Sequence, residues 1–209
     1  MKKILAMAAL AVASVSASAA TNLFVDGSFE SITQPAGTWS TYHVVPGWTV
    51  TQAGSFLPSP HGLEIRNDVA GSAQDGNNFI ELDGYENDRI TQSFATTIGK
   101  TYEVSFWYQN RAGVAAASEG FEAVVLSGGV TSASLVGNAP SDGWLQETMV
   151  FTAGSNFTTF TIAATGTSDS LGTSFDDFTA LAVPEPATMG LFAAGLAIIG
   201  LSARRRRRN

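Results

Sequence analysis

Glu81 and Asp83 are the two carboxylates best placed to do chemistry. They stand two residues apart in a segment of strand-forming residues, so an extended backbone projects both side chains from one face. Such a pair can supply the acid and the base of a glycoside hydrolase, or bind sugar hydroxyls. The same spacing is common on solvated or hydrogen-bonding strand faces of acidic β proteins, and we favour that interpretation over catalysis.

Aromatic side chains form the second candidate set, because sugar rings stack their C–H faces on them. The candidates are Trp39, Tyr42, Trp48, Tyr85, Trp107, Tyr108 and Trp144. Core packing is the favoured interpretation for Trp48, Tyr108 and Trp144. Trp107 differs because of its place in the strand pattern.

The stretch Thr101 to Asn110 has the clearest strand alternation in the chain. One face carries Tyr102, Val104, Phe106 and Tyr108, and the other carries Glu103, Ser105, Trp107 and Gln109. We expect the first set to lie in the core, so Trp107, on the other face, would contact either a ligand or a covering loop. We predict a carbohydrate-binding set of Trp107, Gln109, Arg111, Glu81 and Asp83.

The sequence contains no residue pattern that is typical of histidine-based or nucleophilic catalysis. The two histidines, His43 and His61, have no metal-binding spacing. Neither a Gly-x-Ser-x-Gly elbow nor a glycine-rich phosphate loop occurs. We therefore expect a protein that is not an enzyme.

The central part of the chain is strongly acidic. The formal charge of the whole chain is −7, but residues 21–183 hold 17 acidic and four basic side chains, a formal charge of −13. This balance repels phosphate backbones, excludes nucleic acid as an expected partner and attracts divalent cations. The chain has no cysteine, so burial or a metal ion must hold its loops in place.

Short alternating segments separated by glycine turns predict an all-β domain built as a two-sheet sandwich. The expected strands are 78–82, 90–96, 101–110, 121–126, 145–153, 158–164 and 174–181. The segment Gln34 to Asp75 has four prolines and no regular period, so we expect long loops there.

Both ends of the chain carry export signals. Residues 1–19 form a signal peptide that ends in Ala17-Ser18-Ala19, the site expected for signal peptidase. At the other end, Ala187 to Ala203 is a run of 17 uncharged residues, which as a helix spans about 26 Å, enough to cross a bilayer core. The arginines that follow would stop this transmembrane helix on the cytoplasmic side.

This C-terminal tail, residues 183–209, resembles the PEP-CTERM sorting tail. The resemblance rests on Pro184-Glu185-Pro186, the apolar run, and the arginines Arg204, Arg205, Arg206, Arg207 and Arg208. It implies that an exosortase-type membrane protease cuts near the Pro-Glu-Pro triplet. The protein would then be anchored in the inner membrane only transiently, before reaching the cell surface or the extracellular matrix.

Residues 20–182 resemble galactose-binding-like jelly-roll domains, a group that includes many carbohydrate-binding modules. The resemblance rests on segments 22–30, 46–50, 76–84, 90–94, 99–102 and 175–178. In this group an early glutamate and an aspartate of the last strand commonly hold a structural calcium ion. The matching residues are Glu30 and Asp176, with Asp177 as the alternative.

Together these features predict an exported, non-catalytic module that binds extracellular polysaccharide, as in a biofilm matrix. Two alternatives are a glycoside hydrolase that uses an acidic pair such as Glu81 and Asp83, and a structural matrix protein without a small ligand.

Overall fold

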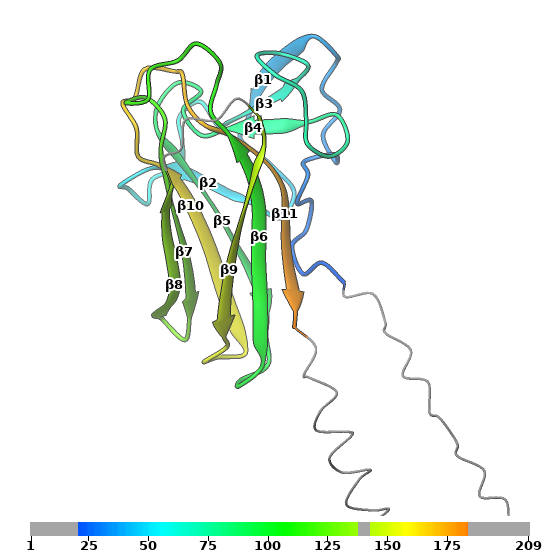
Figure 1. The fold of residues 1–209 in the computed structure, drawn as a ribbon, viewed down its shortest axis with the longest axis vertical. Helices are drawn as coiled ribbons and strands as arrows, with labels where there is room; N and C mark the ends of the chain where they lie inside the picture. The colour runs from blue at the N-terminus through cyan, green and yellow to red at the C-terminus, as the bar shows by residue number, and fades with distance from the viewer. Residues whose placement is uncertain (1–20, 138–142, 184–209) are drawn as a thin grey trace, which may run out of the picture.

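The computed structural model describes residues 21–137 and 143–183, and every element in these ranges is a β-strand (Figure 1). One sheet has the strand order β1 (Thr38–Tyr42), β3 (Leu63–Asn67), β4 (Phe79–Glu81), β11 (Ser174–Ala182), β6 (Thr101–Gln109) and β9 (Leu145–Thr152). The other has the order β2 (Thr49–Gln52), β5 (Asp88–Ala95), β10 (Phe157–Ala164), β7 (Phe121–Ser127) and β8 (Val130–Gly137).

All strand pairs are antiparallel, and the two sheets stack with β6 and β9 lying over β5 and β10 (Figure 1). This arrangement confirms the predicted all-β jelly-roll sandwich. Strands β1, β3 and β4 gather at one end of the molecule, where the candidate site lies.

The core between the sheets is a cluster of aromatic rings. The ring of Phe106 on β6 contacts those of Phe121, Phe160, Phe175 and Phe178. The alternation predicted for β6 is confirmed, because Tyr102, Val104, Phe106 and Tyr108 are all buried. A sheet packed on one face gives this period of two.

The segment Gln34 to Asp75, predicted as loops, contains the three strands β1, β2 and β3, so that prediction is wrong. Every residue of β3 is buried, which its sequence Leu-Glu-Ile-Arg-Asn hides because charged side chains usually mark a solvated face. Strand β8, rich in Ser and Thr and largely exposed, was also not predicted.

Among residues 21–137 and 143–183, no helix is long and apolar enough to cross a membrane. The signal peptide, the Pro-Glu-Pro triplet, the predicted transmembrane helix and the arginine block lie outside the described residues.

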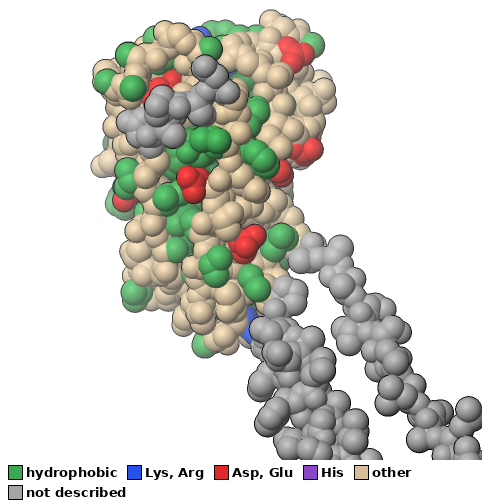
Figure 2. Space-filling model, viewed as in Figure 1, with side chains coloured by type: hydrophobic (Ala, Val, Ile, Leu, Met, Phe, Trp, Pro, Cys, Tyr) green, Lys and Arg blue, Asp and Glu red, His purple; other side chains and the backbone are tan. Residues whose placement is uncertain are grey.

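The described surface carries little basic charge. In the view of Figure 2, acidic and hydrophobic side chains are scattered among polar ones, and Lys and Arg are scarce. This distribution fits the strongly acidic composition of residues 21–183.

Candidate functional site

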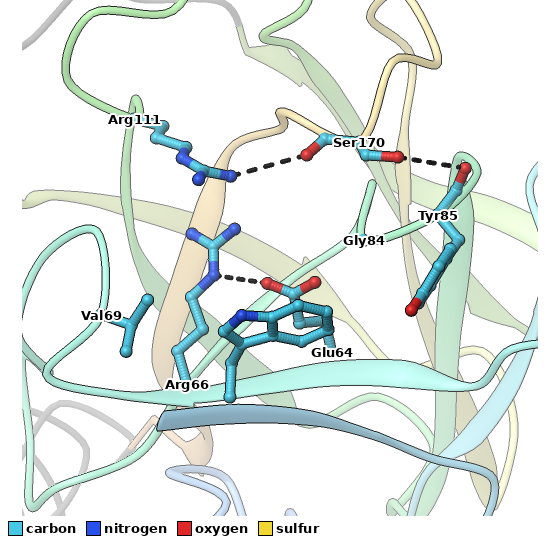
Figure 3. A pocket seen from close by; sticks show the side chains of 8 residues that line it. Glu64, Arg66, Val69, Gly84, Tyr85, Arg111 and Ser170 are labelled. Atoms are coloured by element: carbon cyan, nitrogen blue, oxygen red, sulfur yellow. Dashed lines mark hydrogen bonds and ion pairs between the residues drawn. The ribbon is translucent and has the colours of Figure 1, made fainter. Parts of the chain in front are cut away.

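A pocket of about 230 Å³ opens beside the ends of β3, β4 and β6 (Figure 3). Its lining residues are Trp39, Glu64, Arg66, Val69, Gly84, Tyr85, Arg111 and Ser170. Strand register explains how several of them meet, because Trp39 pairs with Arg66 across β1 and β3, and Glu64 pairs with Glu81 across β3 and β4.

Arg66 forms the floor of the pocket and is only 1% exposed. Its Nε donates to Glu64 Oε1 at 2.5 Å, and its Nη2 is ion-paired with Glu81 Oε2. Without Arg66, two carboxylates would oppose each other across the ladder in a buried position, at a large cost. The remaining group, Nη1, is buried and has no hydrogen-bond partner among the described residues.

Arg111, just beyond the end of β6, faces Arg66 across the pocket (Figure 3). The contacts of its guanidinium are long: Nη1 lies 3.5 Å from the carbonyl oxygen of Ser170 and 3.6 Å from Glu81 Oε2. Its backbone N–H is held more firmly, donating to Glu119 Oε1 at 2.8 Å. The backbone is therefore fixed while the guanidinium keeps donors for another partner.

Glu81 lies behind the two arginines and is fully buried. Its Oε1 accepts the backbone N–H of Gly172 at 2.8 Å. Burial raises the pKa of Glu81 to about 8, although Arg66, Gly172 and Arg111 act in the opposite direction. Glu81 therefore titrates close to neutral pH and carries less than a full charge there.

Two aromatic side chains stand at the pocket wall with part of their surface free. Trp39 is 45% exposed and Tyr85 is 50% exposed, and their ring centroids are 6.4 Å apart. The imidazole of His61 stacks on the Tyr85 ring with a centroid distance of 4.4 Å, and its Nδ1 lies 2.7 Å from Glu86 Oε2. Stacking on His61 orients the Tyr85 ring, so the wall is preformed.

Of the five residues predicted to bind carbohydrate, the structure brings two to this pocket, Arg111 as a lining residue and Glu81 behind it. Asp83 instead accepts the backbone N–H groups of Asp169 and Ser170, at 2.9 and 3.1 Å, and fixes the loop that contributes Ser170 to the pocket.

Trp107 and Gln109 lie on the outer face of β6 and are half-buried, outside the pocket lining. The Trp107 side chain is hydrogen-bonded to Asp177, and the Gln109 amide lies against Gly71 in the loop that precedes β4. Their role in binding stays a prediction.

Seven of the eight lining residues were not in the predicted set, and those with aromatic or charged side chains are Trp39, Glu64, Arg66 and Tyr85. Trp39 and Tyr85 were among the aromatic candidates, but nothing in the sequence brings them together. For Glu64 and Arg66 a signal was present, since Leu63-Glu64-Ile65-Arg66 alternates apolar and charged residues as a strand does.

The residues predicted to hold calcium have other partners in the structure. Glu30 Oε1 accepts backbone N–H groups from Asn77 and Asn78, and Asp176 Oδ2 accepts them from Gln74 and Asp75. Burial raises the pKa of Asp176 to about 7, and also raises the pKa of Asp177.

No group of three or more His, Cys, Asp or Glu side chains in residues 21–137 and 143–183 is arranged to hold a metal ion. Glu30 and Asp176 direct these oxygens at backbone N–H donors. Calcium stays a prediction.

Comparison of the chain with known families gives one match. Residues 182–207 match the family described as the PEP-CTERM protein-sorting motif, which confirms the resemblance of the tail. The motif implies an exported protein that is held in the membrane before processing. No curated protein sequence matches the chain at a significant level.

Solved structures share the fold of the sandwich at low sequence identity. A Stig cyclase, Fisc from Fischerella sp. TAU, superposes with a TM-score of 0.63 at 15% identity, over 79% of this chain and 99% of the cyclase. A family 16 carbohydrate-binding module gives a TM-score of 0.50 at 18% identity, over 77% of this chain and 99% of the module. These likenesses show a jelly-roll fold that carbohydrate-binding modules also have.

Proposed function

We propose that this protein binds carbohydrate, without catalysis, in the pocket between Trp39 and Tyr85. The observation that carries the proposal is the pairing of exposed aromatic rings with buried, prearranged hydrogen-bonding groups in one small cavity. A sugar ring offers both an apolar C–H face for the rings and hydroxyls for polar groups. The fold shared with carbohydrate-binding modules supports the proposal by analogy only.

The geometry of Glu81 and Asp83 favours binding over hydrolysis. Both side chains are fully buried, and their oxygens are engaged by Arg66, Gly172 and the loop 168–170. A hydrolase needs two carboxylates that reach the glycosidic bond from either side. A glycoside hydrolase remains the alternative, tested by the release of reducing ends from the bound polysaccharide.

The proposal also covers how the protein reaches its final location. An exosortase-type protease would remove the tail near Pro184-Glu185-Pro186, and the sandwich would then hold polysaccharide at the cell surface or in the extracellular matrix. Support comes from the sorting motif at residues 182–207.

A glycan array with the full chain in mild detergent tests the binding proposal. Trp39→Ala should weaken retention on the bound glycan by about 1–2 kcal/mol, roughly five- to thirtyfold. The matched control is Phe157→Ala, which removes an exposed aromatic ring outside the pocket lining. Equal retention of both variants and the unmodified chain would contradict the proposed site.

A further inference from the structure

The pocket gathers half of the basic side chains of an acidic domain. Of the four Lys and Arg residues between positions 21 and 183, Arg66 and Arg111 both line it. Of the other two, Arg89 donates to the carbonyl oxygens of Gln52 and Ser55, and Lys100 is exposed just before β6. Two of the four basic side chains in a domain with a formal charge of −13 therefore lie together in the cavity that Trp39 and Tyr85 line.

The two guanidinium groups present unused hydrogen-bonding capacity to the cavity. Arg66 is only 1% exposed, and its Nη1 has no hydrogen-bond partner in the described part of the chain. Within residues 21–137 and 143–183, the Arg111 guanidinium has contacts of 3.5 and 3.6 Å through its Nη1. Figure 3 shows the two groups facing one another above Glu64. A buried donor without a partner costs free energy that an acceptor in the pocket would recover.

We propose that the pocket selects a sugar that carries a carboxylate, a uronic acid, with its ring against Trp39 and Tyr85 and its carboxylate against Arg111 above the Arg66 floor. This inference rests on the proposed function and names the class of sugar. The planar fork of an arginine matches the two oxygens of a carboxylate, and the resulting charge-assisted hydrogen bonds are stronger than those to a neutral hydroxyl.

The charge of the pocket agrees with an anionic group. Glu64 is ion-paired with Arg66, and Glu81, whose pKa burial raises to about 8, carries less than a full charge at neutral pH. Burial also raises the pKa of Glu119, whose Oε1 accepts the backbone N–H of Arg111, so burial disfavours the charged form of both Glu81 and Glu119 beside the two arginines. The net charge of −13 limits the ligand to isolated uronates, because a dense polyanion would be repelled by the rest of the domain.

Matched sugars that differ only at C6 test this inference. The full chain in mild detergent is titrated by NMR with methyl glucuronide against methyl glucoside, and with the corresponding galacto and manno pairs. In at least one pair the acid should bind about tenfold more tightly than the neutral sugar. Arg111→Gln should remove most of that preference, and Arg111→Lys, which keeps the charge but not the fork, should remove part of it.

Lys100→Gln is the matched control, because it removes one positive charge at the opposite end of β6 and should keep the preference. A neutral sugar bound as tightly as its acid in every pair, or a preference that survives Arg111→Gln, would overturn the uronate assignment. If neutral sugars bind as tightly as the acids and lose affinity in Trp39→Ala, the proposed carbohydrate binding is supported while the uronate assignment fails. If no sugar binds in any pair, the uronate assignment fails, and the glycan array decides the proposed function separately.

Discussion

Glu30 and Asp176 hold the two halves of one loop, residues 74–78, although they lie near opposite ends of the described chain. Asp176 accepts the N–H groups of Gln74 and Asp75 at 2.7 and 2.9 Å, and Glu30 accepts those of Asn77 and Asn78 at 2.7 and 2.6 Å. Between them, Gly76 has a φ of +68°, and a Cβ there would lie 2.6 Å from the Glu30 carboxyl group. This position requires glycine for both its backbone angle and its space.

Removing the Asp176 carboxylate should destabilise the sandwich. Asp176→Ala leaves three backbone N–H groups, those of Gln74, Asp75 and Asp177, without their buried acceptor, so we expect a loss of about 2–4 kcal/mol in the free energy of unfolding. Glu30→Gln, at an exposed position, should cost less because the amide oxygen still accepts these N–H groups. Urea unfolding in the presence of chelator measures both losses, and equal stability of Asp176→Ala and the unmodified chain would contradict this role.

The calcium prediction has its own test in the same variants. A bound ion would raise the melting temperature in excess calcium over that in chelator, because a ligand that binds only the folded state stabilises it. Both Glu30→Gln and Asp176→Ala should reduce that rise. Identical melting of the unmodified chain in chelator and in calcium would contradict the prediction and leave the backbone N–H groups as the partners of these carboxylates.

Asp88 should make stability fall as the pH rises. Burial raises its pKa from 3.8 to about 7, and its Oδ1 has no hydrogen-bond partner among the described residues. Because the folded state holds this proton more tightly, the contribution is complete below about pH 4 and is lost as the pH rises through 7. Asp88→Asn should therefore be more stable than the unmodified chain at pH 8, with the difference shrinking toward pH 4.

Thermal melting across this pH range checks the Asp88 prediction. Asp68→Asn is the matched control, since Asp68 is exposed and its positive φ suits asparagine equally well. A pH profile of Asp88→Asn parallel to that of the unmodified chain would show that Asp88 does not control it.

Processing at the tail should leave a mature protein that ends near Pro184-Glu185-Pro186. The sorting motif spans residues 182–207, so the apolar run and Arg204 to Arg208 belong to the segment that we expect to be removed. Intact-mass analysis of the extracellular protein decides this. A mature species that retains the five arginines would indicate a permanent tail anchor instead.

The sequence predicted the sandwich from its regular strands but not the strands that build the pocket. Strand β6 packs one face on the core, so apolar and polar residues alternate along it and the strand could be predicted from the sequence. Strand β3 is buried on both faces because Glu64 and Arg66 neutralise one another, and no local pattern reports that pairing. Trp39 and Tyr85 meet only through the placement of β1 beside β3 and of the turn that follows β4.

The most direct test of the proposed site follows the four tryptophan indole N–H signals in an ¹⁵N NMR titration with the bound oligosaccharide. Trp39 stands at the pocket wall, while Trp48, Trp107 and Trp144 are hydrogen-bonded to Asp26, Asp177 and Ser72 respectively. We predict that the Trp39 signal shifts in proportion to occupancy, and that the buried Trp48 signal does not move. A shift at Trp107 with Trp39 unchanged would contradict the pocket and place the carbohydrate on the outer face of β6.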